Sequence, residues 1–240
     1  MRSRLLSFVK ARQHSARMKA FYGSILSPGD LVFDIGANVG DRTDTFDRLG
    51  CRVVAVEPQA ACVARLERRF GHRANVSVVR SAVGASEGTA EMFESDSDVL
   101  SSLSPGWMER VQASGRFGGA TWSRGRTVPL TTLDHLADVH GEPSFVKVDV
   151  EGYEAEVFRG LSRPVRHVSF EFTPEAIETA YECIVYLDRL GPYTYNVSYG
   201  ESMAFELPQD VSSSRIREIL DAVASDHRLF GDVYARRATS

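Results

Sequence analysis

The stretch VFDIGANVGDRT, residues 32–43, decides the fold of this chain. A short apolar run ends in Asp34, and a loop that carries Gly36 and Gly40 follows it. The chain then resumes with Phe46 in a pattern of helical spacing, so we expect strand, tight loop and helix, the opening unit of a doubly wound α/β fold. Glycine lacks a Cβ, so a ligand can approach the loop backbone and the N–H groups at the start of the helix.

The spacing of this loop differs from the G-x-G-x-x-G pattern of dinucleotide-binding proteins. It is Asp34-x-Gly36-x-x-x-Gly40, and Asn38 stands where a second closely spaced glycine would lie. A carboxylate in the loop repels a pyrophosphate and favours a ligand with positive charge. The next apolar run ends in Glu57, which is placed to accept hydrogen bonds from ribose hydroxyls. A nucleoside with a cationic tail, S-adenosylmethionine, satisfies both observations.

Three motifs in the sequence resemble the FkbM family of S-adenosylmethionine-dependent methyltransferases. They are DIGANVG at residues 34–40, VEP at 56–58 and, most specifically, FVKVDVEGYE at 145–154. The first motif alone indicates only a Rossmann-like methyltransferase, and the third one narrows the choice. The resemblance extends from about Phe21 to about Glu201. It implies a doubly wound Rossmann-like methyltransferase fold, with a mostly parallel seven-stranded sheet and helices on both faces.

Length and composition are typical of one globular α/β domain. The chain has 240 residues, a length that allows a well-buried core. Hydrophobic residues make up 43% of it and charged residues 25%, as in ordinary globular proteins. Its formal charge of −4 argues against a nucleic-acid partner. No apolar run approaches the ~20 residues that span a membrane, and the short basic N-terminus does not fit a signal peptide. Three widely spaced cysteines without a C-x-x-C pattern fit the reducing cytoplasm.

The N-terminal residues predict a separate helix. Residues 2–25 combine apolar and basic residues at helical spacing, and SPG at residues 27–29 ends the pattern. We therefore divide the chain into an N-terminal helical extension at 1–27, packed on the domain, and a methyltransferase domain at 28–240. A lid over the substrate end and a contact in a homo-oligomer are alternative roles for the extension.

Apolar runs and turn signals predict the rest of an alternating α/β chain. Further strands are expected at residues 52–56, 76–80, 145–149, 165–172, 193–199 and 232–237, and helices at 59–70, 132–139, 154–161, 174–190 and 212–224. Residues 87–94, with Gly88 at the turn, predict a hairpin or a short strand pair. The polar segment 95–126 is long for a connection in a compact domain, and Trp107, Phe117 and Trp122 argue against plain disorder. We interpret it as a variable insertion near the substrate cleft, with surface decoration as the alternative.

In open α/β sheets ligands bind beyond the carboxyl ends of the strands, so polar residues there are candidates for the site. We predict that the cofactor is bound by Asp34, Gly36, Asn38, Gly40 and Glu57. In the family that the sequence resembles, the loop after the third strand lies beside the adenine, which adds Ser81 and Ala82.

Asp149 is the first candidate for the reacting end of the site and Glu171 the second. In the family the motif around Asp149 lies beside the methyl donor and acceptor, where a carboxylate can take the proton of an attacking hydroxyl. Glu151 lies two residues further on, but Gly152 suggests that it caps the next helix. Asp149 and Glu171 are hard oxygen ligands suited to Mg²⁺ or Ca²⁺, yet no clustered histidine supports a metal site, and we expect no required metal.

These observations predict an S-adenosylmethionine-dependent O-methyltransferase. The family resemblance implies a small-molecule or glycan acceptor with a free hydroxyl, on a sugar, a glycan or a secondary metabolite. One alternative is a nicotinamide-dependent oxidoreductase, which the missing third glycine and the acidic loop disfavour. The other alternative is a non-catalytic protein that binds an adenosyl ligand.

Overall fold

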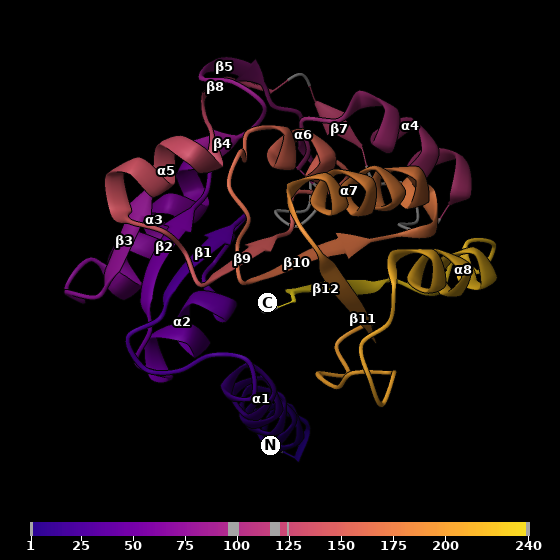
Figure 1. Ribbon diagram of the computed structural model, residues 1–240. Helices are drawn as coiled ribbons and strands as arrows, with labels where there is room; N and C mark the ends of the chain where they lie inside the picture. Colours follow the sequence, from indigo (N-terminus) through magenta and orange to yellow (C-terminus); the bar gives the residue numbers. More distant parts are fainter. Residues whose placement is uncertain (1, 96–100, 116–120, 124, 239–240) are drawn as a thin grey trace.

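A seven-stranded sheet forms the centre of the computed structural model, which describes residues 2–95, 101–115, 121–123 and 125–238 (Figure 1). Its strands lie in the order β11-β12-β10-β9-β1-β2-β3. They are β1 (Leu31–Ile35), β2 (Arg52–Val56), β3 (Val76–Val79), β9 (Phe145–Val148), β10 (His167–Phe172), β11 (Tyr193–Tyr199) and β12 (Gly231–Arg237). All neighbours pair in parallel except β12, which is antiparallel to β10 and β11. The predicted mostly parallel sheet is confirmed.

Helices cover both faces of this sheet, as the doubly wound fold requires (Figure 1). Buried side chains of α1 (Arg2–Gly23), α2 (Asp41–Arg48) and α3 (Ala60–Phe70) form one core with one face. The other face packs on α5 (Leu133–His140), α6 (Glu154–Arg159), α7 (Ile177–Leu190) and α8 (Ser213–Val223). A short 3₁₀ helix, η1 (Pro174–Ala176), leads into α7. The predicted helices thus exist, with ends displaced by a few residues.

The register of the central strands places polar side chains on the α1–α3 face. Asp34 of β1 lies opposite Lys147 of β9, and Lys147 lies opposite Ser169 of β10. Successive strand residues point to opposite faces, so Glu171, two residues beyond Ser169, shares this face. Glu171 in turn pairs with Asp232 of β12. A band of buried charge therefore crosses one face of the sheet near the carboxyl ends of its strands.

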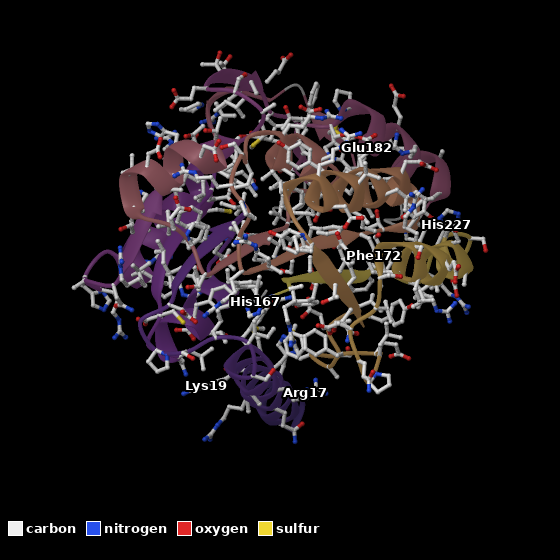
Figure 2. The ribbon with its side chains drawn as sticks, viewed as in Figure 1. Arg17, Lys19, His167, Phe172, Glu182 and His227 are labelled. Carbon is white, nitrogen blue, oxygen red and sulfur yellow. The ribbon has the colours of Figure 1, made fainter. Side chains whose placement is uncertain are left out.

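The N-terminal helix α1 packs on the sheet through its last turns. Phe21 makes edge-on ring contacts with Tyr22 and Tyr234, and Tyr22, which is fully buried, contacts Phe46 of α2 in the same way. Arg17 and Lys19 are exposed on the same helix (Figure 2). Among the described residues, no helix combines the length and the apolar character that a membrane span needs. The division of the chain at residue 27 stays a prediction.

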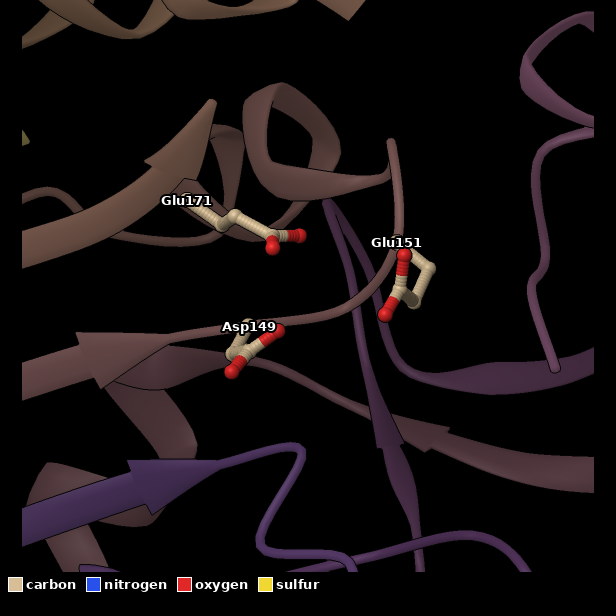
Figure 3. A group of neighbouring side chains, drawn as sticks. All are labelled: Asp149, Glu151 and Glu171. Carbon is tan, nitrogen blue, oxygen red and sulfur yellow. The ribbon is translucent and has the colours of Figure 1, made fainter. Parts of the chain in front are cut away.

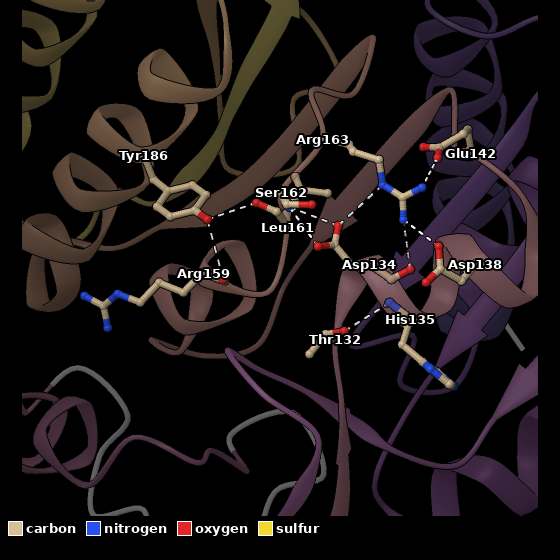
Figure 4. A network of polar contacts seen from close by, with 10 residues as sticks. All are labelled: Thr132, Asp134, His135, Asp138, Glu142, Arg159, Leu161, Ser162, Arg163 and Tyr186. Atoms are coloured by element: carbon tan, nitrogen blue, oxygen red, sulfur yellow. Dashed lines mark hydrogen bonds and ion pairs between the residues drawn. The ribbon is translucent and has the colours of Figure 1, made fainter.

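A second, three-stranded sheet corrects the prediction for residues 87–94. β5 (Gly88–Glu91) does not fold back on its neighbours but pairs antiparallel with β8 (Thr127–Thr131), and β4 (Ala82–Val83) pairs parallel with the same strand. The predicted hairpin is therefore wrong. β8 leads directly into α5, whose N-cap is Thr132, with a side-chain oxygen that accepts the N–H of His135 (Figure 4).

The long polar segment contains structure of its own. α4 (Pro105–Ser114) begins after the cap Ser104, and β6 (Glu94–Ser95) pairs with β7 (Trp122–Ser123). Trp107 of α4 is fully buried, and its ring lies at 83° to that of Trp122. Phe117 lies outside the described residues. The aromatic residues of this segment that the structure describes thus serve packing.

Polar contacts join α5 to the segment between α6 and β10. Arg163, between α6 and β10, forms ion pairs with Asp138 of α5 and with Glu142, and the carboxylate of Asp134 accepts the N–H of Ser162 (Figure 4). These groups are largely exposed, so each pair contributes little to stability. They orient α5 against the β10 connection.

Candidate active site

A cavity of about 350 Å³ lies beyond the carboxyl ends of the parallel strands, a size typical of small-molecule sites. Seven of the predicted site residues line it: Gly36, Asn38, Glu57, Ser81, Ala82, Asp149 and Glu171. The other two do not line it: Asp34 lies in β1, and Gly40 is the N-cap of α2. The structure therefore brings residues from five strand ends, spread over more than 130 positions of the chain, into one site.

The two glycines of the β1–α2 loop are required by its conformation. Gly36 has φ +79°, and a Cβ there would lie 1.8 Å from the carbonyl oxygen of Asp149. Gly40 has φ +87°, and a Cβ there would lie under 3 Å from side-chain atoms of Leu66 and Phe70 on α3. The loop thus turns sharply against both β9 and α3, which leaves its backbone facing the cavity.

Glu57, at the end of β2, is held by the backbone on both sides of it. Its Oε2 accepts the N–H of Asn38 at 2.9 Å, and its Oε1 accepts the N–H of Gln59 at 2.8 Å. Burial raises the pKa of Glu57, and the two N–H donors oppose this rise. The side chain of Gln59 also bonds to this carboxylate. These bonds fix the orientation of the carboxylate at the cavity wall, where its remaining lone pairs can accept a hydrogen bond from a ligand hydroxyl.

Asp34 is almost fully buried beneath the same loop. Its Oδ2 accepts the hydroxyl hydrogen of Thr43 on α2 at 2.6 Å. Burial raises the pKa of Asp34, whereas Lys147 and Thr43 lower it. Through this hydrogen bond Asp34 joins β1 to α2 and helps to fix the conformation of the loop between them. Direct contact with a ligand stays a prediction.

The loop after β3 forms the far wall of the cavity. Ser81 is 5% exposed, and its hydroxyl lies 2.8 Å from the carbonyl oxygen of Ala82 and 3.0 Å from that of Pro129 on β8. The Ser81 hydroxyl is thus engaged by the small sheet, while Ala82 and Met92 present apolar surface to the cavity. Apolar walls of this kind suit the faces of an adenine ring.

Asp149, at the end of β9, is paired with a lysine that the sequence analysis did not single out. Lys147 is 1% exposed, and its Nζ donates a hydrogen bond to Asp149 Oδ2 at 2.6 Å. Burial raises the pKa of Asp149, but the attraction of Lys147 and this hydrogen bond outweigh it and the pKa lies below its usual value. Burial lowers the pKa of Lys147, but Asp149 and Asp232 raise it by more. The pair thus presents an ionised carboxylate in a fixed orientation.

Glu171 and Glu151 lie next to Asp149, and the three carboxylates converge on one space (Figure 3). One oxygen of each lies within 4.8 Å of the others. Burial, followed by repulsion from Glu151 and Asp149, raises the pKa of Glu171 well above its usual value. The pKa of Glu171 is thus raised while that of Asp149 is lowered, which makes Asp149 the better candidate for an ionised base.

The loop between β9 and α6 differs from the prediction. Glu151 does not cap α6, whose N-cap is Tyr153 without a side-chain bond. Instead Glu154 turns back and its Oε1 accepts the N–H groups of Val150 and Gly152, at 3.2 and 3.1 Å. Glu151 adopts φ +54° and its side chain faces the cavity. Burial raises the pKa of Glu154 to about 7, against the effect of these N–H donors.

Two further residues link the cavity to the N-terminal helix. Arg42 of α2 donates from Nη2 to both oxygens of Glu201, which lines the cavity, at 2.9 and 3.0 Å. His14 of α1 lies 3.5 Å from the same carboxylate. No local signal predicts this contact, because Arg42 and Glu201 are 159 residues apart. The pairing of Lys147 with Asp149, by contrast, had a local signal in the sequence. A lysine inside an apolar strand, two residues before Asp149, lies on the same face of the strand as that residue.

The charge of the cavity selects its ligands. The described residues that line it include five carboxylates and no lysine or arginine; the acids are Glu57, Asp149, Glu151, Glu171 and Glu201. Such a site attracts a sulfonium or an ammonium group and repels a pyrophosphate. The acidic lining of the cavity and the strand order of the sheet together define a Rossmann-like methyltransferase of the kind that uses S-adenosylmethionine.

A family model described as the methyltransferase FkbM domain matches residues 34–207, most of the chain. The protein therefore belongs to the FkbM methyltransferase family, and its cofactor is S-adenosylmethionine. No curated protein matches the sequence significantly.

Several solved structures share the general fold. A precorrin-6y C5,15-methyltransferase from Geobacter metallireducens is 13% identical with a TM-score of 0.48, covering 92% of this chain and 87% of its own. A putative methyltransferase from Streptococcus mutans in complex with SAH is 9% identical with a TM-score of 0.43, covering 92% and 95%. An S-adenosylmethionine-dependent O-methyltransferase from Thermotoga maritima is 11% identical with a TM-score of 0.44, covering 92% and 65%. Similarity at this level says nothing about the acceptor.

Proposed function

We propose that this methyltransferase is an O-methyltransferase, which transfers the methyl group of S-adenosylmethionine to a hydroxyl of a sugar, a glycan or a secondary metabolite. The observation that carries the proposal is the ionised Asp149, fixed by Lys147 at the wall of the cavity that Glu57 also lines. A hydroxyl acceptor needs a proton acceptor beside it, and Asp149 is the carboxylate best prepared for this task.

The residues on the β1–β3 side of the cavity fit the cofactor. Gly36 lets the backbone approach closely, and the carboxylate of Glu57, fixed by Asn38 and Gln59, can accept hydrogen bonds from the ribose hydroxyls. When bound, the cofactor supplies an electrophilic methyl group on a sulfonium. The carboxylates of the cavity stabilise that positive charge and hold it where the acceptor can reach the methyl carbon.

Asp149 accepts the proton of the acceptor hydroxyl. A neutral hydroxyl is a weak nucleophile, with a pKa near the ~15.7 of water, but its proton becomes acidic as the new C–O bond forms. A carboxylate of low pKa is sufficient at that stage, and Lys147 keeps Asp149 ionised over a wide range of pH. Glu171 is the second candidate for the base, since it lines the same cavity as Asp149.

The acceptor that fits this cavity is neutral. Glu151, Glu171 and Glu201 line the side toward β10 and β11, where they repel phosphate and carboxylate groups and can accept hydrogen bonds from several hydroxyls. This charge supports a small-molecule or glycan acceptor and weighs against a nucleic acid. A cytoplasmic location belongs to the same proposal, supported by three free and buried cysteines.

Calorimetry and a labelled-methyl assay test the proposal together. Glu57→Gln places an NH₂ against one of two N–H donors, so it is expected to weaken binding of S-adenosylmethionine at least about tenfold. Asp149→Asn keeps the shape of the site and is expected to bind within a few-fold of the unmodified protein, while transfer to hydroxylated extracts falls by about 100-fold or more. Glu67→Gln, on the exposed surface of α3, is the control.

Two outcomes would contradict the proposal in different ways. A folded sample that shows no binding at about 1 mM cofactor, the upper end of common KM values, removes the cofactor site. Tight binding without methyl transfer to any hydroxylated fraction favours the non-catalytic alternative.

A further inference from the structure

The three carboxylates of Asp149, Glu151 and Glu171 have the dimensions of a cation site. Ligand oxygens of one Ca²⁺ ion lie 2.3–2.6 Å from it, so two of them are separated by at most about 5 Å, and about 4 Å for Mg²⁺. The oxygens here all lie within 4.8 Å of one another. Figure 3 shows the side chains turned toward a common space from β9, from the following loop and from β10.

The pairing of Asp149 with Lys147 is compatible with a cation. Lys147 Nζ bonds to Oδ2, which leaves Oδ1 for another partner. Three acids and one ammonium group leave a net negative charge in this corner of the cavity. Since a group of acids is common on protein surfaces without any ion, the inference needs an independent sign of a ligand.

Thr173 supplies that sign. It is 5% exposed and lines the same cavity as the three acids, yet its Oγ1 is buried without a hydrogen-bond partner among the described residues. The backbone remains extended at Thr173, with φ −128° and ψ 152°, so strand alternation directs its side chain to the same face as Glu171. A buried hydroxyl without a partner costs about 1–3 kcal/mol, which a ligand on this wall would relieve.

We propose that Asp149, Glu151, Glu171 and the Oγ1 of Thr173 form a binding site for one hard divalent cation, Mg²⁺ or Ca²⁺. All four ligand atoms are oxygens, which these ions prefer, whereas zinc and copper sites use mainly nitrogen or sulfur. From the sequence we expected no required metal, because no clustered histidine supports one. Glu151 was assigned there to helix capping, and Thr173 was not singled out.

The role of the cation rests on the proposed methyl transfer. Four protein oxygens leave at least two positions of a six-coordinate ion open. Two neighbouring hydroxyls of a sugar or catechol-like acceptor can occupy them, which orients the acceptor beside Asp149 and polarises the hydroxyl that reacts. The preferred acceptors would then be vicinal diols.

Calorimetric titration of the full-length protein with MgCl₂ and with CaCl₂, after removal of metals by a chelator, tests the site without cofactor or acceptor. We expect binding of one ion. Glu151→Gln and Glu171→Gln are expected to weaken it at least about tenfold. Thr173→Val, which keeps the shape but removes Oγ1, weakens it as well, whereas Thr173→Ser restores it. Glu218→Gln, exposed on α8, leaves it unchanged.

Circular dichroism confirms that each variant is folded. The proposal is overturned if the unmodified protein binds neither ion at about 10 mM, above the dissociation constants of weak calcium sites. It is equally overturned if Glu171→Gln binds as tightly as the unmodified protein. Titration of S-adenosylmethionine in chelator separates the two proposals, because cofactor binding without cation binding leaves the proposed function standing.

Discussion

Position 36 accepts only a hydrogen atom as its side chain, and the reason is the neighbouring strand. β1 and β9 run side by side, and the backbone of Asp149 passes directly over the point where a Cβ would stand. The left-handed φ adds a second restriction. The glycine was predicted from the loop motif as a site of close ligand approach. The structure adds that the protein's own backbone, at Asp149, approaches this glycine as well.

Gly36→Ala is therefore expected to lower the free energy of unfolding by about 2–4 kcal/mol, the sum of overpacking and an unfavourable φ. Gly29→Ala is the matched control, because Gly29 has φ +91° but no atom within 4 Å of a Cβ, and it should cost only about 1 kcal/mol. Urea unfolding measures both. Equal losses in the two variants would show that the contact with Asp149 is relaxed at little cost.

Elements that pair across long stretches of sequence were the ones predicted least well. β5 and β8 are each short, and nothing in residues 88–91 indicates a partner about 40 positions further on. The helix α4 was missed for a related reason. Its sequence is polar on most sides, and its stability comes from Trp107, which packs against Gly152, Ala176 and Trp122.

Because this contact anchors α4 on the loop that carries Glu151, Trp107→Ala should release the helix. Loss of a fully buried tryptophan costs about 3–5 kcal/mol, more than a ten-residue helix can supply by itself. Hydrogen exchange is expected to rise in residues 105–114 while β1 and β9 stay protected. Gln112→Ala, exposed on the same helix, should leave exchange unchanged. A uniform rise over the whole molecule would show instead that α4 unfolds only with the sheet.

At the scale of the molecule, buried acids make stability depend on pH. Glu154 is 2% exposed, and its pKa of about 7 in the folded protein lies above its ordinary value of 4.5. As the pH rises, Glu154 loses its proton in the unfolded chain before it does so in the folded protein. Its contribution to the free energy of unfolding is therefore fully present below pH 4.5 and is lost as the pH rises through 7. This difference between the two pKa values of Glu154 corresponds to about 3 kcal/mol in the free energy of unfolding.

Glu154→Gln should remove this contribution, because the amide oxygen still accepts the two loop N–H groups and no proton is exchanged. Urea unfolding at about pH 5 and pH 8 is expected to show a fall in stability that is smaller by about 2.5 kcal/mol in the variant. Glu182→Gln, exposed on α7, is the control. An identical pH dependence in Glu154→Gln and the unmodified protein would show that Glu154 ionises freely in the fold.

The sequence by itself determined the alternating α/β order, the glycine loop and the acids at the strand ends. These features follow from periodicity and spacing within about ten residues, which local chain geometry fixes. Only the tertiary structure decided that Lys147 bonds to Asp149 and that Glu151 lies beside Glu171. It also decided that Thr173 lines the same cavity with a hydroxyl that has no hydrogen-bond partner among the described residues. Those relations depend on register between strands and on burial, and both arise from contacts between residues far apart in the chain.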